Sequence, residues 1–350
     1  MKKMIKYTGI LLLIFVLAFA VLIGIATLSD YQPSAKELVY ESAEHQSFQD
    51  TDTLNLLIWN IGYAGLDKAM DFFYDGGKKT RTTKEQLKEN LQNIGNFLSK
   101  QDSMDFIMLQ EVDIDSKRSY HTMQVDTLQK FLPSYLPLTA TNYLVSYVPL
   151  PFYDPMGKVN GGLTTFTKYK PATSYRHSFP GNYAWPKSLF LLDRCFLVTR
   201  FPVGDNELLI VNTHNSAYDD GSMRQEQMEY LSEFLLQEYA LGNYIIVGGD
   251  WNQSPAGFQP SYQNYLFDSI NLLYLPDNYL PEWEWMYDSA SPTNRRLQTS
   301  FSQETSLTTI IDFYLVSPNV KPLSINTLSR NFSNSDHEPV AAKVKLIKEP

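Results

Sequence analysis

Acidic, amide and imidazole side chains stand at the ends of short apolar runs along the sequence. Each run suits a buried strand, where such groups are costly unless they are paired. The residues concerned are Asn60, Glu111, His214, Asp250, Asn252, Asp312, Asp336 and His337. Carboxylate and amide oxygens are the ligands that hard divalent cations prefer, and histidine titrates near neutral pH. Gathered at one sheet edge, these groups would pair with one another or with a metal ion.

Each of these residues also has a structural explanation when it is taken alone. Asn60 and the segment Asp250–Asn252 suit turns, and Glu111 suits a surface position after a strand. Asp336-His337 suits a cap before the last strand, and His214 suits a hydrogen-bonded core histidine. The complete ordered set favours a functional site, because these separate explanations would all have to hold at once.

The elements that must position these residues alternate between strands and helices from residue 53 onward. Strands are expected at 54–59, 105–110, 207–213, 244–248, 309–316 and 340–346. Helices are expected after Thr83 with Gln86 and after Ser222 with Gln225, two pairs spaced as capping residues. Sheets with helices outside them indicate an α/β or α+β fold.

Two aromatic stretches interrupt this alternation. Residues 142–195 hold eleven aromatic side chains and six basic residues against two acids, whereas residues 258–287 hold nine aromatic side chains and four acids. Both stretches suit loops and short hairpins that pack on the body of the protein. They also suit the walls of a substrate cleft, because binding residues concentrate on loops.

The composition excludes several classes of protein. Hydrophobic residues make up 43% and charged residues 19% of the 350 residues, so a core can form and global disorder is excluded. The single cysteine, Cys195, excludes a disulfide framework and a cysteine-rich zinc site. The net charge of -9 argues against a broad basic face for nucleic acid.

The chain begins with a basic segment and then an apolar one. Lys2, Lys3 and Lys6 precede the run Thr8–Leu28, which carries no charge. As a helix this run would be about 31 Å long, enough to cross a bilayer. Residues 1–29 are therefore expected to be a membrane anchor or a cleaved signal segment, with the rest of the chain outside the cytoplasm. Residues 30–52 are polar and aperiodic and are expected to be a tether, which leaves residues 53–350 for the folded domain.

Six short motifs, in this order, resemble the endonuclease/exonuclease/phosphatase superfamily. They are Trp59-Asn60, Leu109-Gln110-Glu111, Asn212-Thr213-His214, Gly249-Asp250-Trp251-Asn252, Ile311-Asp312-Phe313 and Ser335-Asp336-His337. The resemblance implies the DNase I-like fold, a four-layered sandwich of two packed, mostly antiparallel sheets with outer helices. It also implies that residues 53–350 hydrolyse phosphoester bonds with Mg²⁺ or Mn²⁺.

The resemblance further assigns the metal to Asn60, Glu111 and Asp336, whose oxygens suit Mg²⁺. A metal there would neutralise charge on the phosphate and on the leaving group.

It assigns the acid–base chemistry to the other members of the set. Asp250 and Asn252 would orient the attacking water and the phosphate, and Asp250 and His337 are equal candidates for the base. His337 could instead bind the phosphate. His214 would stabilise the phosphate or protonate the leaving oxygen, with Asp312 hydrogen-bonded to its ring.

Three further residues are weaker candidates for contact with the substrate. Arg118 and Tyr120 follow Glu111 closely, although a solvated loop explains them equally well. Asn160, in Asn160-Gly161-Gly162, could bring the backbone close to a phosphate or form a hairpin turn.

The expected substrate is a phosphate ester outside the cytoplasm. The outward location and the acidic composition favour a phosphodiesterase or phosphatase for a phospholipid or a small organic phosphate. A secreted or membrane-tethered nuclease is the first alternative, and a non-catalytic ligand-binding protein on the same fold is the second.

Overall fold

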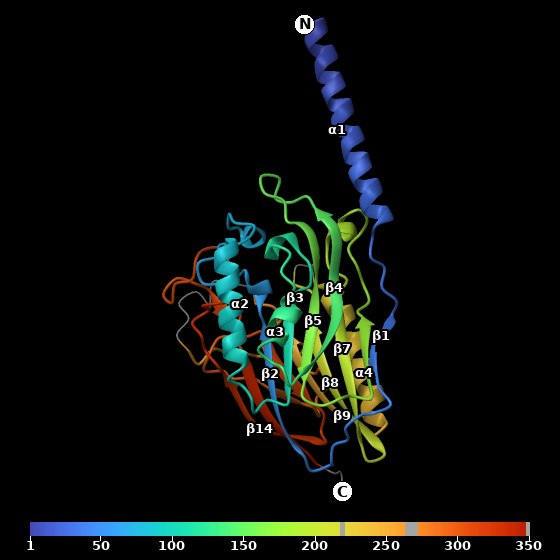
Figure 1. Ribbon diagram of the computed structural model, residues 1–350, viewed down its shortest axis with the longest axis vertical. Coiled ribbons are helices and arrows are strands. Elements are labelled where there is room, and N and C mark those ends of the chain that lie inside the picture. The colour runs from blue at the N-terminus through green and yellow to red at the C-terminus, as the bar shows by residue number, and fades with distance from the viewer. Residues whose placement is uncertain (218–220, 263–271, 348–350) are drawn as a thin grey trace.

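The computed structural model describes residues 1–217, 221–262 and 272–347, and in this part of the chain two large sheets pack face to face (Figure 1). The six-stranded sheet has the order β14 (Val320–Thr327), β15 (Val340–Leu346), β2 (Thr53–Asn60), β3 (Phe106–Asp113), β5 (Gly157–Thr167) and β4 (Leu136–Val148). The seven-stranded sheet has the order β1 (Lys36–Glu41), β6 (Thr173–Ser178), β7 (Cys195–Val203), β8 (Asn206–His214), β9 (Tyr244–Asp250), β13 (Asp312–Val316) and β10 (Glu284–Met286).

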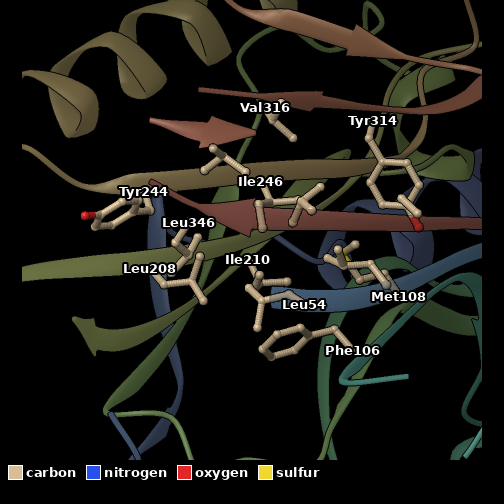
Figure 2. Packing of buried hydrophobic residues seen from close by; sticks show 14 of the residues in the cluster. Leu54, Phe106, Met108, Leu208, Ile210, Tyr244, Ile246, Tyr314, Val316 and Leu346 are labelled. Carbon is tan, nitrogen blue, oxygen red and sulfur yellow. The ribbon is translucent and has the colours of Figure 1, made fainter. Parts of the chain in front are cut away.

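The inner faces of the two sheets form the central core. Figure 2 shows Leu54, Phe106 and Met108 of one sheet meeting Ile210 and Ile246 of the other, all buried. Alternate residues of these strands point inward, and the residues between them are buried on the outer face, so the strands are continuous apolar runs in the sequence.

Helices cover the outer faces. On the six-stranded sheet, α2 (Lys84–Leu98) and α3 (Gln124–Gln129) bury leucines such as Leu91 and Leu128. On the seven-stranded sheet, α4 (Ser222–Ala240) buries Met228 and Leu231. Figure 1 shows α2 and α4 on opposite sides of the molecule. The predicted four-layered sandwich of two mostly antiparallel sheets is therefore confirmed.

Two parallel strand pairs in the middle of the sheets determine where the polar strand ends lie. In one sheet β2 runs parallel to β3, with Asn60 opposite Gln110. In the other, β8 runs parallel to β9, with His214 opposite Asp250. Parallel neighbours end at the same edge, so each pair delivers its terminal polar residues together.

One of the two predicted helix N-caps is confirmed and the other is wrong. Thr83 caps α2, because its Oγ1 accepts the Gln86 backbone N–H at 3.2 Å. The predicted cap at Ser222 is wrong, because α4 begins at Ser222 and its N-cap is Gly221.

Two sequence-based expectations are corrected by the strand bounds. Residues 36–41 form β1, which pairs with β6, so they belong to the folded domain and not to a tether. The expected strand over 309–316 is split into β12 (Thr308–Thr309), which pairs with β11 (Asn294–Arg295), and β13. Residues 142–195 contain the hairpin of β4 and β5, the strand β6 and the loops between them, as the interpretation of loops and hairpins predicted, although β4 and β5 are longer than the short strands expected. Part of the other aromatic stretch, residues 263–271, lies outside the described residues.

Candidate active site

Four strand ends bring polar side chains to one edge of the sandwich. Asn60 ends β2, His214 ends β8 and Asp250 ends β9. The antiparallel β13 begins at Asp312, directly opposite Asp250. Gly249 permits the close pairing of β8 and β9 here, because a Cβ at that position would lie 2.0 Å from the Thr213 carbonyl oxygen.

The loop before β15 brings the last two residues of the set to the same edge. The Ser335 hydroxyl donates to the Asn60 carbonyl at 2.8 Å, and the Trp59 indole donates to the His337 carbonyl at 2.9 Å. These bonds fasten Asp336 and His337 over the end of β2. Both side chains are buried.

The partner of Asp312 differs from the sequence-based expectation. Its Oδ2 lies 2.8 Å from His337 Nδ1, so the predicted bond between Asp312 and His214 is wrong. The bond fixes the His337 ring with Nε2 facing the cleft side, where the Asn294 amide lies 3.0 Å away. Burial would lower the pKa of His337, but the surrounding carboxylates, led by Asp312, raise it well above its ordinary value.

His214 instead faces Asp250. Its Nε2 lies 3.4 Å from Asp250 Oδ2, and its Nδ1 has no hydrogen-bond partner among the described residues. Burial and the nearby cation Arg194 lower the pKa of His214 well below its ordinary value, so its ring is neutral.

Asp250 connects the two halves of the site. Its Oδ2 accepts the Asn60 amide at 2.9 Å and lies 3.8 Å from His337 Nε2. Its Oδ1 accepts the Asn252 backbone N–H at 2.9 Å. The Asn252 side chain donates to the Asn215 carbonyl at 2.9 Å, which fixes its orientation at the edge.

Glu111 reaches the same edge through an irregularity of β3. The register of β3 against β5 shifts between Leu109 and Val112, and Glu111 has a φ of 53°, an uncommon value for a non-glycine residue. This bulge turns Glu111 toward Asn60, whose amide lies 3.4 Å from Oε1.

A large cleft of about 680 Å³ opens over these residues. Its lining includes the polar residues Glu111, His214, Asp250, Asn252, Asp336 and His337. Around them the walls carry Arg118, Lys187, Arg194, Arg224, Arg295 and Arg296, together with the aromatic residues Tyr63, Phe72, Tyr74, Tyr143 and Tyr183. The stretch over 142–195 therefore contributes to the cleft wall, as one of its two interpretations predicted.

The three weaker candidates separate in the structure. Arg118 lines the cleft, where it forms a two-bond ion pair with Asp113 and lies 3.9 Å over the Tyr63 ring. Tyr120 and Asn160 are not among the residues that line the cleft. The Tyr120 hydroxyl donates to the Thr82 carbonyl at 2.7 Å, and the Asn160 backbone pairs with Ser116, so both hold loops in place.

The comparison with protein families decides the identity of the fold. The model of the Endonuclease/Exonuclease/phosphatase family matches residues 57–337. The chain belongs to this family. No curated protein sequence matches the chain. The family's members are metal-dependent phosphoesterases.

Solved structures of the family agree on the fold. An endonuclease/exonuclease/phosphatase from Beutenbergia cavernae has a TM-score of 0.54 at 16% identity, over 85% of this chain and 72% of that chain. A Bacteroides vulgatus member has a TM-score of 0.52 at 16% identity, over 84% and 99%. ANGEL2, described as a 2',3'-cyclic phosphatase, has a TM-score of 0.53 at 16% identity, over 87% and 99%.

The family's divalent cation fits the predicted ligands Asn60, Glu111 and Asp336. All three carry oxygen atoms, and Glu111 is open to the cleft. The Asn60 amide oxygen accepts the Gly62 backbone N–H at 3.0 Å, so it would have to leave this bond to bind a cation. Asp336 is a buried carboxyl whose pKa is raised to about 7, by burial and then by the charge of Glu111. Two carboxylates that repel each other in a buried setting are the arrangement that a bound cation relieves.

A second group of donors lies beside this set. One ligand atom each of Asp250, Asp312 and His337 lie within 4.8 Å of one another, close enough for a shared ion. Asp312 and His337 in this group are bonded to each other through Oδ2 and Nδ1. Asn60, Glu111 and Asp336 are the better ligand set for a hard cation, because they carry oxygen donors and no imidazole nitrogen.

Sequence analysis did not predict Asn294 or the arginines of the cleft wall other than Arg118. Asn294 contacts His337 from β11, and the Arg295 backbone N–H donates to the Asp336 carbonyl at 2.9 Å. Nothing in the segment Thr293–Arg296 marks it as functional, because it follows no apolar run. The pairing of β11 with β12 and a bridge from Asn294 to His337 carry these residues to the site.

Proposed function

We propose that this family member is a membrane-anchored, metal-dependent phosphodiesterase or phosphatase whose domain lies outside the cytoplasm. One observation carries the proposal: Asp250 Oδ2 meets Asn60, His214 and His337 within 3.8 Å, under a cleft with cationic walls. Cations and N–H donors around a bound phosphate are what phosphoester hydrolysis requires.

The proposed roles follow from the contacts. A divalent cation held by Asn60, Glu111 and Asp336 would supply charge neutralisation at the phosphate. Asp250 and Asn252 would orient the water that attacks the phosphorus.

The two histidines take different positions in this proposal. His337, held by Asp312 through Nδ1, presents Nε2 to the phosphate or to the water. The neutral His214 would donate a hydrogen bond from its ring N–H to a phosphate oxygen; its lowered pKa disfavours the protonated ring that transfer of a proton to the leaving oxygen would need. Asp250 and His337 are the two candidates for the base, since both line the cleft. The raised pKa of His337 favours its protonated ring, which suits phosphate binding better than proton abstraction.

The cleft wall supports a phospholipid or a small organic phosphate as substrate. Cationic side chains suit the phosphate, and aromatic and aliphatic side chains such as Tyr143 and Leu191 suit an organic or acyl portion. A nuclease is the second candidate, because the same combination of arginines and aromatic rings suits stacked bases and their phosphates. The catalytic set is complete, which argues against the third candidate, a non-catalytic binding protein.

The location rests on α1 (Lys2–Leu28). This helix is long and apolar enough to cross a membrane, and its residues are almost all exposed. Its three lysines stand at the N-terminal end, which favours a cytoplasmic N-terminus. A retained anchor and a cleaved signal segment remain the two alternatives.

A panel of phosphate esters tests the substrate class. The full-length chain, purified in detergent with Mg²⁺ or Mn²⁺, is offered phospholipids, single-stranded and duplex DNA, and small phosphomonoesters and phosphodiesters. We expect phospholipid or small-ester hydrolysis to exceed DNA cleavage, and Asp250→Asn to abolish it. Preferred cleavage of DNA would select the nuclease instead, and no hydrolysis of any ester would favour the binding protein.

A further inference from the structure

Outside α1, aromatic side chains are strongly exposed at one end of the described domain. Phe152, Tyr153 and Trp185 are 85%, 71% and 64% exposed, and Leu150 is 40% exposed. We call these four residues the rim. Three belong to the loop between β4 and β5, and Trp185 belongs to the segment before β7. Clustered exposed apolar residues mark a surface that meets a membrane or a partner.

Trp185 of the rim lies beside the end of α1. The Trp185 indole donates to the Thr27 hydroxyl at 3.3 Å. A small cavity between the two parts is lined by Leu22, Ile25 and Ala26 of α1 and by Leu144 and Tyr147 of β4, among others. The end of β4 is therefore level with the last two turns of α1. In Figure 1 the loop that follows β4 extends beyond this point, on the side from which α1 projects.

The length of α1 fixes the depth of the rim in a bilayer. The run Thr8–Leu28 of about 31 Å matches the hydrocarbon thickness, so Thr27 lies at its outer boundary when the run spans the membrane. Trp185 is then at the level of the headgroups, where Trp and Tyr are enriched. In this placement the loop after β4, which carries Phe152 and extends on the side from which α1 projects, would reach into the leaflet.

Basic residues flank the rim. The Tyr153 hydroxyl donates to the Lys78 carbonyl at 2.7 Å, which places the exposed Lys78 beside the loop. Lys187, also exposed, follows Trp185 by two residues and lies 3.9 Å over the Tyr183 ring. Lysines beside exposed aromatic residues suit anionic lipid headgroups, which attract basic side chains.

We infer that the rim inserts into the leaflet around α1 and holds the mouth of the cleft against the lipid headgroups. The inference rests on the proposed anchor and names the surface of the substrate's membrane as the partner. Met156 lines the cleft and follows the loop, and Tyr183 and Lys187 line it on either side of Trp185. Insertion of the rim therefore positions two parts of the cleft wall, so that a phosphate ester in the same leaflet can enter.

Depth measurement tests the inference without relying on activity. The full-length chain is reconstituted into vesicles of phosphatidylcholine and phosphatidylglycerol as Phe152→Cys or Leu241→Cys, each carrying an environment-sensitive fluorophore. Leu241 is a matched control because it is 70% exposed and directly follows α4. It lies close to the start of β9, whereas Asp250 is at the other end of that strand. The native Cys195 is fully buried and should react little with the fluorophore. Labelling of the unsubstituted chain measures this background.

We expect the emission of the label at position 152 to shift to the blue. Lipids that carry a quencher near the headgroup should quench most of its fluorescence. The label at position 241 should show neither effect. Equal, water-like emission at both positions, in chains that resist alkaline carbonate extraction, overturns the inference and leaves the anchor intact. Release of the chains by carbonate overturns the anchor, and the inference with it.

A second measurement separates insertion from protein–protein contact. Phe152→Glu and Leu241→Glu are compared on phospholipid in vesicles and on a water-soluble phosphodiester. We expect Phe152→Glu to lower vesicle hydrolysis several-fold and to leave hydrolysis of the soluble ester unchanged, with Leu241→Glu neutral on both. If the blue shift at position 152 appears at high protein concentration without lipid, a second copy of the chain covers the rim. That result would overturn the inference.

Discussion

Asp250 is the residue on which the geometry of the site depends most. Its two carboxylate oxygens contact an amide of β2, the ring of His214 and the backbone of Asn252. A carboxylate with so many donors holds these groups at fixed positions before any ligand arrives. Such preorganisation lowers the cost of binding a transition state.

The pairing of Asp312 with His337 predicts a specific pattern of mutant effects. Each of Asp312→Asn and His337→Ala should lower kcat by about 10²-fold or more, the usual scale for acid–base groups. The double mutant should be little worse than either single mutant, because Asp312 acts through the ring that it holds. Steady-state kinetics of the four proteins measure this.

His214 provides the control for that cycle. Combined with Asp312→Asn, His214→Ala should give losses that multiply, since the two side chains are not bonded to each other. The opposite pattern would contradict this account. If the losses in kcat multiply for Asp312→Asn with His337→Ala but do not for Asp312→Asn with His214→Ala, Asp312 acts through His214 and not through His337.

The sequence predicts which residues meet but not how they pair. A buried carboxylate such as Asp312 needs a partner, and this much follows from its apolar surroundings. Two imidazoles were available, and the choice depends on the loop before β15, which the Ser335 and Trp59 bonds hold over β2. Contacts made by a loop leave no periodic pattern, which is why the pairing with His214 was predicted wrongly.

Among the elements, β3 and the short helix η3 (Lys117–Ser119) are joined by the ion pair of Arg118 and Asp113. Both side chains are buried, and Arg118 also lines the cleft. Arg118→Met should destabilise the fold by about 3–5 kcal/mol, because it leaves Asp113 charged and unpaired.

The double variant Arg118→Met/Asp113→Leu controls for this effect. It should recover most of the stability, since two apolar groups replace a buried pair. Denaturant unfolding measures both variants. A loss below about 1 kcal/mol for Arg118→Met would show that the pair is solvated and weak.

The sheet that contains β1, β6 and β7 should be sensitive to acid through His177. Burial, with the nearby Lys36 and Arg200, lowers the pKa of His177 to about 4. The unfolded chain binds a proton near the ordinary value and the folded chain does not, so stability falls as pH drops from about 6.5 and levels off near the folded pKa.

His177→Phe tests that sign. The variant keeps a ring against Phe196, 5.0 Å away, and removes the titration. Its loss of unfolding free energy between pH 7 and pH 4 should be smaller than that of the parent chain by about 2–3 kcal/mol. Parallel pH profiles for the two proteins would exclude His177 as a contributor.

At the level of elements, the sequence predicts the central strands and misses the edge strand. Buried strands such as β2 and β9 are continuous apolar runs and were expected. β1 is Lys-Glu-Leu-Val-Tyr-Glu, a half-exposed edge strand that exists because β6 supplies its hydrogen bonds. A pattern confined to residues 30–52 contains no information about that partner.

For the molecule as a whole, the candidate site, the rim and α1 lie at the same end. The strands that carry Asn60 and Asp250 point toward that end, and α1 projects from it in Figure 1. An anchored enzyme in this orientation would face the surface of its own membrane. This arrangement gives the proposed lipid substrate a physical basis that the composition alone does not provide.

Metal-dependent hydrolysis, measured on the purified full-length chain, tests the central claim most directly. The rate with a phosphodiester from the substrate panel is recorded in Mg²⁺, in excess chelator and after Mg²⁺ is restored, for the parent chain, for Glu111→Ala and for Glu229→Ala, an exposed acid on α4. We predict hydrolysis that disappears in chelator, returns with Mg²⁺, falls close to the uncatalysed rate in Glu111→Ala and is unchanged in Glu229→Ala. Full activity in chelator, or an active Glu111→Ala, would contradict the account.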